Sequence, residues 1–197
     1  MLFTHRLVPA AQGGGMPTGW RVIMKKLEDY VRSIPDFPEE GIIFRDVTSI
    51  LQDKDGLHLA IDKLQELVQD LDFDVVVGPE SRGFIFGVPV AYNLGKAFVP
   101  VRKKGKLPCE TIEREYDLEY GKAVIEMHKD AIKPGQKVVI IDDLIATGGT
   151  IEAITKLVEQ LGGEVVKIIF VMELCGLKGR EKLAGYNVDS VIKYEGK

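Results

Sequence analysis

The chain has 197 residues, of which 45% are hydrophobic, and this size and composition predict a single domain with one well-packed core. The formal net charge of −4 and the isoelectric point near 5.5 argue against a nucleic-acid-binding protein and favour a small-molecule partner. The two cysteines lack metal-ligand spacing and no apolar run approaches membrane-spanning length, so we expect a soluble cytoplasmic protein with no membrane partner.

Residues 1–23 differ from the rest of the chain. They contain a run of three glycines and two prolines, and they show no sustained hydrophobic periodicity. They also lack the basic start and apolar core of a secretory signal. We expect a disordered leader, with Met24 as the better candidate for the true start and residues 24–197 as the folded domain.

The remaining chain alternates between apolar runs of strand length and segments with helical periodicity. The predicted helices cover residues 24–33, 55–70 with Asp55 as N-cap, 84–94 and 151–161. The predicted strands cover residues 73–77, 97–101, 123–128, 138–141, 165–172 and 188–194. Crossovers of this length predict a doubly wound α/β fold, with a mostly parallel sheet flanked by helices and a small N-terminal hood at about residues 24–50.

A loop of small residues with one arginine follows the strand at 73–77. Loops at the carboxyl ends of parallel strands form the ligand-binding edge of such sheets. Arg82 in this loop can hold a phosphate group with its planar guanidinium, and the alternative for it is a surface salt bridge.

The next strand is followed by the basic run Arg102-Lys103-Lys104-Gly105-Lys106. A solvated surface is the simpler explanation for a charge run. However, this run leaves the carboxyl end of a strand and begins a polar segment at 107–120 that is too long for an ordinary connection. We therefore predict a lid at about residues 102–121, with residues 123–128 as its hairpin-like return.

Four consecutive β-branched apolar residues at 138–141 predict a central strand that is buried on both faces. Asp142 and Asp143 follow it, and residues 146–150 offer small side chains, two glycines and two hydroxyls where the next helix begins. Backbone N–H groups and the helix N-terminus can bind phosphate there, while the acids suit ribose hydroxyls or a Mg²⁺ ion carried by the substrate. The alternative is an acidic turn that is glycine-rich for steric reasons.

Residues 142–150 resemble the phosphoribosyl-diphosphate (PRPP) loop of the type I phosphoribosyltransferases. The stretches at 34–38, 41–46 and 118–122 resemble the adenine-specific enzymes of that family, and the likeness extends from Met24 to Glu195. The resemblance implies the type I phosphoribosyltransferase fold, with adenine and PRPP as substrates and AMP and pyrophosphate as products. It also implies a role in purine salvage, Mg²⁺ as cofactor and a homodimer.

The resemblance further implies roles for individual residues. The 5′-phosphate and ribose would be bound by Asp142, Asp143, Ala146, Thr147, Gly148, Gly149 and Thr150, and the two aspartates could also contact Mg²⁺. Pyrophosphate would be bound by Glu80, Ser81, Arg82, Arg102, Lys103 and Lys106, with a cis peptide bond between Glu80 and Ser81. Adenine would lie against Ile43, Phe44, Arg45 and Leu174, although ordinary packing is the alternative for Phe44 and Leu174. Glu119 and Tyr120 would close over the reaction, with Glu119 as general acid and base.

Two other functions share parts of this pattern. A 6-oxopurine phosphoribosyltransferase would have the same PRPP loop, but the stretch at 41–46 favours adenine. A PRPP-sensing regulator would need a DNA-binding domain, and the sequence shows no basic recognition helix.

The PRPP loop also carries an expectation about mutation. We expect Gly148→Val to abolish activity and leave the fold intact, because a branched side chain would stand where phosphate meets the backbone.

Overall fold

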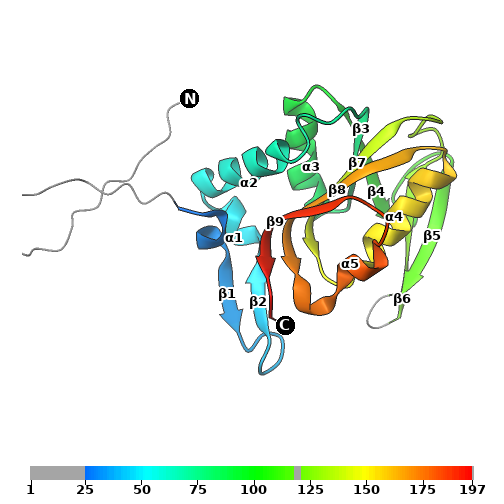
Figure 1. Ribbon diagram of the computed structural model, residues 1–197. Coiled ribbons are helices and arrows are strands. Elements are labelled where there is room, and N and C mark those ends of the chain that lie inside the picture. The colour runs from blue at the N-terminus through cyan, green and yellow to red at the C-terminus, as the bar shows by residue number, and fades with distance from the viewer. Residues whose placement is uncertain (1–24, 118–120, 197) are drawn as a thin grey trace, which may run out of the picture.

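The computed structural model describes residues 25–117 and 121–196, and its centre is a seven-stranded sheet with the order β5-β6-β4-β3-β7-β8-β9 (Figure 1). The strands are β3 (Val75–Pro79), β4 (Ala97–Lys103), β5 (Thr111–Asp117), β6 (Lys122–His128), β7 (Lys137–Ile145), β8 (Glu164–Leu174) and β9 (Val188–Tyr194). The neighbours among β4, β3, β7, β8 and β9 pair in parallel, whereas β5 and β6 form an antiparallel hairpin at one edge. The predicted mostly parallel α/β fold is confirmed.

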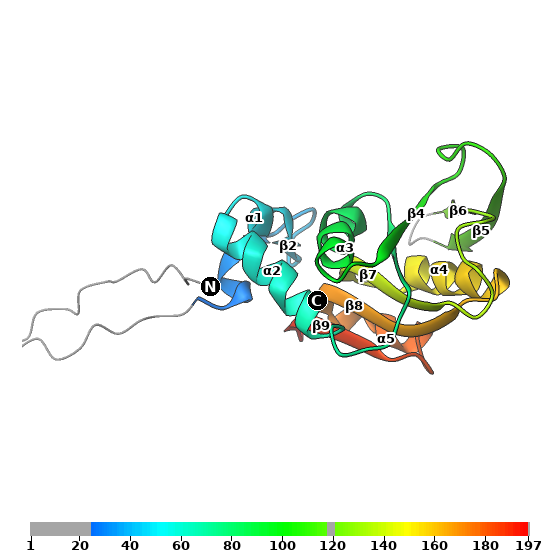
Figure 2. The ribbon, with the colours of Figure 1, turned by 90° about the horizontal axis from the view of Figure 1, so that it is seen from above.

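Helices α2 (Lys54–Glu66) and α3 (Arg82–Asn93) lie side by side over one face of the sheet, while α4 (Gly149–Gln160) packs on the other (Figure 2). Successive strand residues point to opposite faces, so Val139 and Ile141 of β7 join the core beneath α2 and α3, and Val138 and Ile140 join the core beneath α4. Burial on both sides explains the uninterrupted apolar run of this strand. In the described part of the chain, no helix has the length and apolar content needed to cross a membrane.

The N-terminal hood contains little helix. Residues 24–33 were expected to be helical, but the described part forms one 3₁₀ turn, η1 (Leu27–Tyr30), followed by β1 (Arg32–Pro35). Proline disfavours helical backbone at the residue before it, and β1 instead pairs antiparallel with β2 (Ile43–Asp46). A single helical turn, α1 (Thr48–Leu51), then leads to α2.

The start of α2 also differs from the expectation. Asp53, rather than Asp55, is the N-cap: it has extended backbone, and its side chain accepts hydrogen bonds from the N–H groups of Asp55 (2.9 Å) and Gly56 (3.4 Å). Both acids satisfy the residue preference for this position, and only the backbone conformation distinguishes them.

Part of the predicted lid is regular structure. The expected return strand is confirmed as β6, and β5 pairs with it from Thr111 opposite His128 to Asp117 opposite Lys122. Within the polar segment at 107–120, residues 111–117 are therefore a strand that is hydrogen-bonded along the edge of the sheet. Residues 118–120 lie outside the described part of the chain.

Candidate active site

The loops that follow β3 and β7 enclose a cavity of about 260 Å³ at the carboxyl end of the sheet. Its lining consists of residues 79–82, Tyr116 and residues 142–151. All the residues predicted to bind the 5′-phosphate and ribose belong to this lining, together with Glu80, Ser81 and Arg82. Three strands that are not consecutive in sequence thus contribute to one concave surface.

The floor of the cavity is the turn between β7 and α4. Gly148 is the N-cap of α4 and has φ +80°, a left-handed conformation that glycine adopts without steric cost. Gly149 begins the helix, and the first N–H groups of a helix have no partner within it. These donors and the positive end of the helix dipole favour an anion at this position.

A second backbone segment packs directly against this turn. After β8 come two short helical turns, η2 (Cys175–Leu177) and α5 (Gly179–Lys182), and Gly179 closely approaches the PRPP loop. A Cβ atom at Gly179 would lie only 2.4 Å from the carbonyl oxygen of Ala146, and one at Gly148 would lie 2.5 Å from the carbonyl oxygen of Gly179. Both contacts are too short to exist, so each glycine is required by the packing of the other segment.

This packing corrects the expectation for Gly148→Val. We now expect the substitution to lower the thermal unfolding midpoint as well as to abolish activity, because the new side chain must displace the backbone of Gly179. Gly95→Val is a matched control, since Gly95 has φ +64° but open space around its Cβ position. The control should lose only the roughly 1–2 kcal/mol of a left-handed non-glycine residue and remain active. Equal melting temperatures for the two variants would contradict the clash.

Two acids and an arginine lie beside the turn. Burial raises the pKa of the Asp142 carboxyl well above its ordinary value, and the adjacent charge of Asp143 adds to this effect. Asp143 is 3% exposed, and its Oδ2 lies 2.9 Å from Nε of Arg82. Within the described residues, that oxygen accepts no hydrogen bond of good geometry despite this ion pair, so it retains capacity for a further donor or cation.

These acids fit the predicted Mg²⁺ only as partial ligands. No group of three or more histidine, cysteine or acidic residues in the described ranges could hold a metal by itself. Mg²⁺ is commonly bound through one or two carboxylates together with substrate phosphates and water. The uncommitted oxygen of Asp143 and its neighbour Asp142 match that limited contribution.

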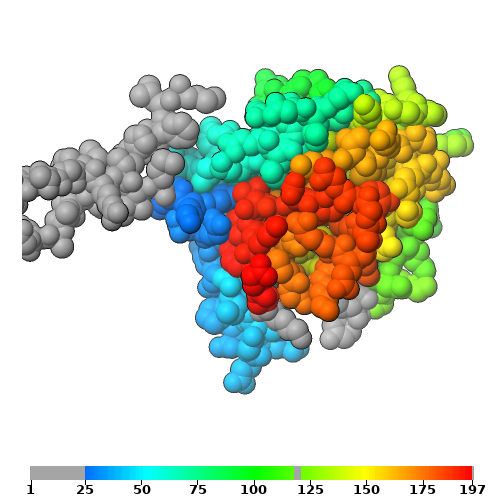
Figure 3. All heavy atoms as spheres, viewed as in Figure 1, coloured from blue at the N-terminus to red at the C-terminus, as the bar shows by residue number. Residues whose placement is uncertain are grey.

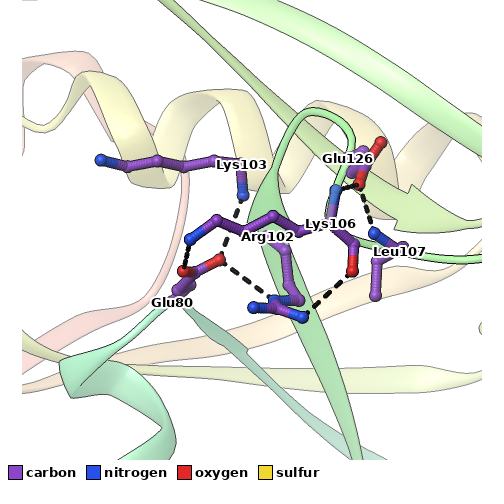
Figure 4. A network of polar contacts seen from close by, with 6 residues as sticks. All are labelled: Glu80, Arg102, Lys103, Lys106, Leu107 and Glu126. Atoms are coloured by element: carbon purple, nitrogen blue, oxygen red, sulfur yellow. Dashed lines mark hydrogen bonds and ion pairs between the residues drawn. The ribbon is translucent and has the colours of Figure 1, made fainter.

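The predicted pyrophosphate residues form a charged network (Figure 4). The Glu80–Ser81 peptide bond is cis, as expected. The Glu80 carboxylate pairs with Nζ of Lys106 and with Nε of Arg102 (3.1 Å), and it accepts a hydrogen bond from the backbone of Lys103 (3.4 Å). The contacts with Lys106 and then Arg102 lower the pKa of Glu80 to about 2, against the opposing effect of burial, so Glu80 is an anion at ordinary pH.

The predicted adenine residues lie apart from the cavity lining. Ile43 and Phe44 on β2 are 43% and 37% exposed, so neither is a core residue, and the Phe44 ring contacts Phe37 edge-on at 5.3 Å. The Arg45 guanidinium stacks 4.2 Å from the ring centre of Tyr194, which pairs with Leu174 across β8 and β9. In the space-filling view, the blue hood lies directly against the red C-terminal strand (Figure 3). This contact brings the hood to the strand end that carries Leu174.

The two predicted catalytic residues, Glu119 and Tyr120, lie outside the described residues. The hairpin that precedes them does reach the site, because Tyr116 lines the cavity and a Cβ at Gly149 would lie 3.3 Å from the carbonyl oxygen of Asp117. Tyr116 was missed from the sequence. The sequence feature that could have indicated it is the alternation of residues along β5, in which Ile112 and Tyr116 share one face and pack on the core.

Comparison with known proteins agrees with this geometry. The phosphoribosyl transferase domain family matches residues 46–196. The adenine phosphoribosyltransferase of Lachnoclostridium phytofermentans is 82% identical over 174 residues, which is 88% of this chain and 100% of that protein. This chain belongs to the adenine phosphoribosyltransferases. The corresponding protein of Agathobacter rectalis is 65% identical over 88% of this chain and 100% of that protein.

Solved structures of this family have the same fold. The adenine phosphoribosyltransferase of Thermoanaerobacter pseudethanolicus superimposes with a TM-score of 0.81 at 54% identity, covering 85% of this chain and 98% of that one. The Saccharomyces cerevisiae member, at 43% identity and a TM-score of 0.77, covers 84% of this chain and 96% of that one. The yeast protein was crystallised with adenine and an imino-altritol bisphosphate. The predicted family and fold are confirmed.

Proposed function

We propose specific roles for the site residues in the reaction of an adenine phosphoribosyltransferase, in which adenine and PRPP give AMP and pyrophosphate. The observation that carries this assignment is the cavity in which an acidic pair, an arginine and a helix N-terminus meet at the carboxyl end of the sheet. The turn at residues 146–150 binds the 5′-phosphate through its backbone. Asp142 and Asp143 face the ribose hydroxyls.

The loop that follows β3 receives the leaving group. Displacement at the ribose carbon leaves negative charge on pyrophosphate, which Arg82, Arg102 and Lys106 stabilise. When Mg²⁺ is bound with PRPP, it supplies further positive charge to these oxygens, and Asp142 and Asp143 are the residues that would contact it.

We assign the catalytic roles to Glu119 and Tyr120, which follow β5 in the sequence. Forming the bond to the ribose requires the attacking ring nitrogen of adenine to lose its proton, and Glu119 accepts that proton as general base and returns it as general acid in the reverse reaction. Tyr120 covers the reacting groups, and exclusion of water by the closed hairpin protects PRPP from hydrolysis. The base itself lies against Phe44 and Leu174, with the backbone of Ile43 and Arg45 along its edge.

Base preference tests the adenine assignment. β2 belongs to a two-stranded sheet, so its backbone has one edge outside that pairing in the described residues, and this edge can present both a donor and an acceptor. Hypoxanthine would leave such groups unpaired, and we expect kcat/KM for adenine to exceed that for hypoxanthine by at least ~10²-fold. Pyrophosphate release should be followed with PRPP, Mg²⁺ and each of adenine, hypoxanthine, guanine and xanthine. Comparable efficiency with hypoxanthine would contradict the proposed preference for adenine.

We further propose that two copies of the chain associate through α3. Ile85, Val88 and Tyr92 are 40%, 45% and 84% exposed and lie on one face of that helix. Tyr92→Glu should raise the dissociation constant of the dimer by about 10-fold or more. His58→Glu, at an exposed position of α2, should leave that constant unchanged. Light scattering coupled to size exclusion, over a dilution series, measures both. A monomeric wild-type chain at every concentration would rule this interface out.

We also place the chain in the cytoplasm. Cys109 and Cys175 are both free thiols, which is typical of proteins in a reducing compartment.

A further inference from the structure

A buried carboxylate lies behind the pyrophosphate residues and has no part in the roles given above. Glu126 on β6 is 3% exposed. In the strand register it stands between Arg102 of β4 and Glu113 of β5. Buried acids are costly unless their oxygens are satisfied, so the partners of Glu126 indicate what it does.

Those partners are backbone groups of a single turn. Oε1 of Glu126 accepts hydrogen bonds from the N–H groups of Lys106 (2.8 Å) and Leu107 (2.7 Å) (Figure 4). Burial raises the pKa of Glu126, but hydrogen bonds from the turn outweigh it and the net pKa lies below the ordinary value. The ionised side chain therefore fixes the turn that connects β4 to β5.

The same turn contains Lys106 and accepts a hydrogen bond from Arg102, and these are the two cationic side chains that contact Glu80. Arg102 donates from Nη1 to the carbonyl oxygen of Lys106 (3.0 Å), while its Nε and the Lys106 ammonium both contact Glu80. Arginine and lysine have long, flexible side chains, so their convergence on one anion depends on where the backbone of the turn lies. Glu80 marks the point at which the two positive charges meet.

We propose that Glu126 is a positioning residue for the pyrophosphate part of the site. It touches neither substrate, and it acts by holding the turn at residues 105–107 so that Arg102 and Lys106 are aligned before pyrophosphate or PRPP binds. This inference rests on the proposed function for the identity of the ligand. A glutamine at this position keeps one acceptor oxygen but loses the negative charge that strengthens both hydrogen bonds, and an apolar side chain would leave both turn N–H groups without this acceptor.

The test compares Glu126→Gln with Glu113→Gln. Both remove one carboxylate at the same level of the hairpin, but Glu113 is exposed and pairs with Lys104 (2.6 Å) rather than with the turn backbone. We expect Glu126→Gln to raise the Kd for magnesium pyrophosphate, measured by calorimetry, and the KM for PRPP by ~10-fold. The KM for adenine should stay within about twofold, and Glu113→Gln should change none of these values.

Gly105→Ala perturbs the same turn from the solvent side and keeps the test valid if Glu126→Gln does not fold. Gly105 has φ +82° and open space at its Cβ position, so the substitution strains the turn without affecting the core. Like Glu126→Gln, Gly105→Ala should raise the Kd for magnesium pyrophosphate while the KM for adenine stays nearly unchanged. An unchanged pyrophosphate Kd in the folded variants, or an equal loss for adenine and pyrophosphate, would overturn the proposal.

The calorimetric measurement requires no turnover. Failure of the wild-type chain to convert adenine and PRPP would refute the proposed function, whereas a wild-type chain that binds pyrophosphate no better than Glu126→Gln would refute this inference alone.

Discussion

Glu119→Gln is expected to lower kcat by ~10²–10⁴-fold while KM for PRPP and adenine changes little. Glutamine keeps the size and hydrogen-bonding capacity of the side chain but cannot exchange a proton with the purine. If the purine gives up its proton to Glu119 only as the bond to the ribose forms, the loss of this proton transfer removes transition-state stabilisation and leaves substrate binding in the ground state unchanged. Steady-state kinetics with both substrates varied measures the separation.

The hairpin supplies a matched control for this variant. Glu115 lies on β5, is exposed and pairs with Lys122 at 2.5 Å, so Glu115→Gln removes an equal charge nearby and should be nearly silent. Tyr120→Phe, measured in parallel, tests how much the proposed covering of the reacting groups by Tyr120 contributes to kcat. An unchanged kcat in Glu119→Gln would remove Glu119 from the catalytic assignment, and a raised KM with normal kcat would make it a binding residue.

Asp143→Asn should lower kcat/KM for PRPP by about 10²-fold or more with the fold retained. Asp143 is 3% exposed and pairs with Arg82 at 2.9 Å, so the amide removes the charge that faces both this arginine and the ribose side of the cavity. The Arg82 side chain is 45% exposed and stays solvated when its partner is neutral, which limits the loss of stability. Kinetics with PRPP varied and a thermal melt measure the two effects.

The control for this prediction is an acid that pairs with the opposite end of β7. Asp72 is exposed and pairs with Lys137 at the start of β7 (2.6 Å), so Asp72→Asn also removes one carboxylate from one ion pair. It should leave PRPP kinetics unchanged. Normal PRPP affinity and turnover in Asp143→Asn would show that the paired acids do not serve the ribose or its metal.

Much of the site was predictable because its residues follow one another in sequence. The strand at 138–141, the two acids and the glycine turn form one continuous segment, and the carboxyl ends of parallel strands form the ligand-binding edge of such sheets. Arg82 was predictable for the same reason, since its loop follows another buried strand of the same parallel sheet. The cis bond at Glu80–Ser81 was inferred from family resemblance, and local pattern alone does not indicate it.

The features that local pattern missed depend on distant partners. Residues 32–35 form a strand because β2 is beside them, and residues 111–117 are regular because β6 pairs with them. Tyr116 belongs to the site only because the hairpin folds back over the start of α4.

The sequence by itself determined the α/β class, the central strand and the place of the PRPP loop, because hydrophobic periodicity and turn chemistry act over a few neighbouring residues. Only the tertiary structure decided that Gly179 closes against Gly148, that Arg45 stacks on Tyr194, and that Glu126 accepts hydrogen bonds from the turn at Lys106 and Leu107. These contacts join residues that are 19 to 149 positions apart, as with Glu126 and Leu107 at one extreme and Arg45 and Tyr194 at the other. Their energy depends on packing and burial, which no local window of sequence contains.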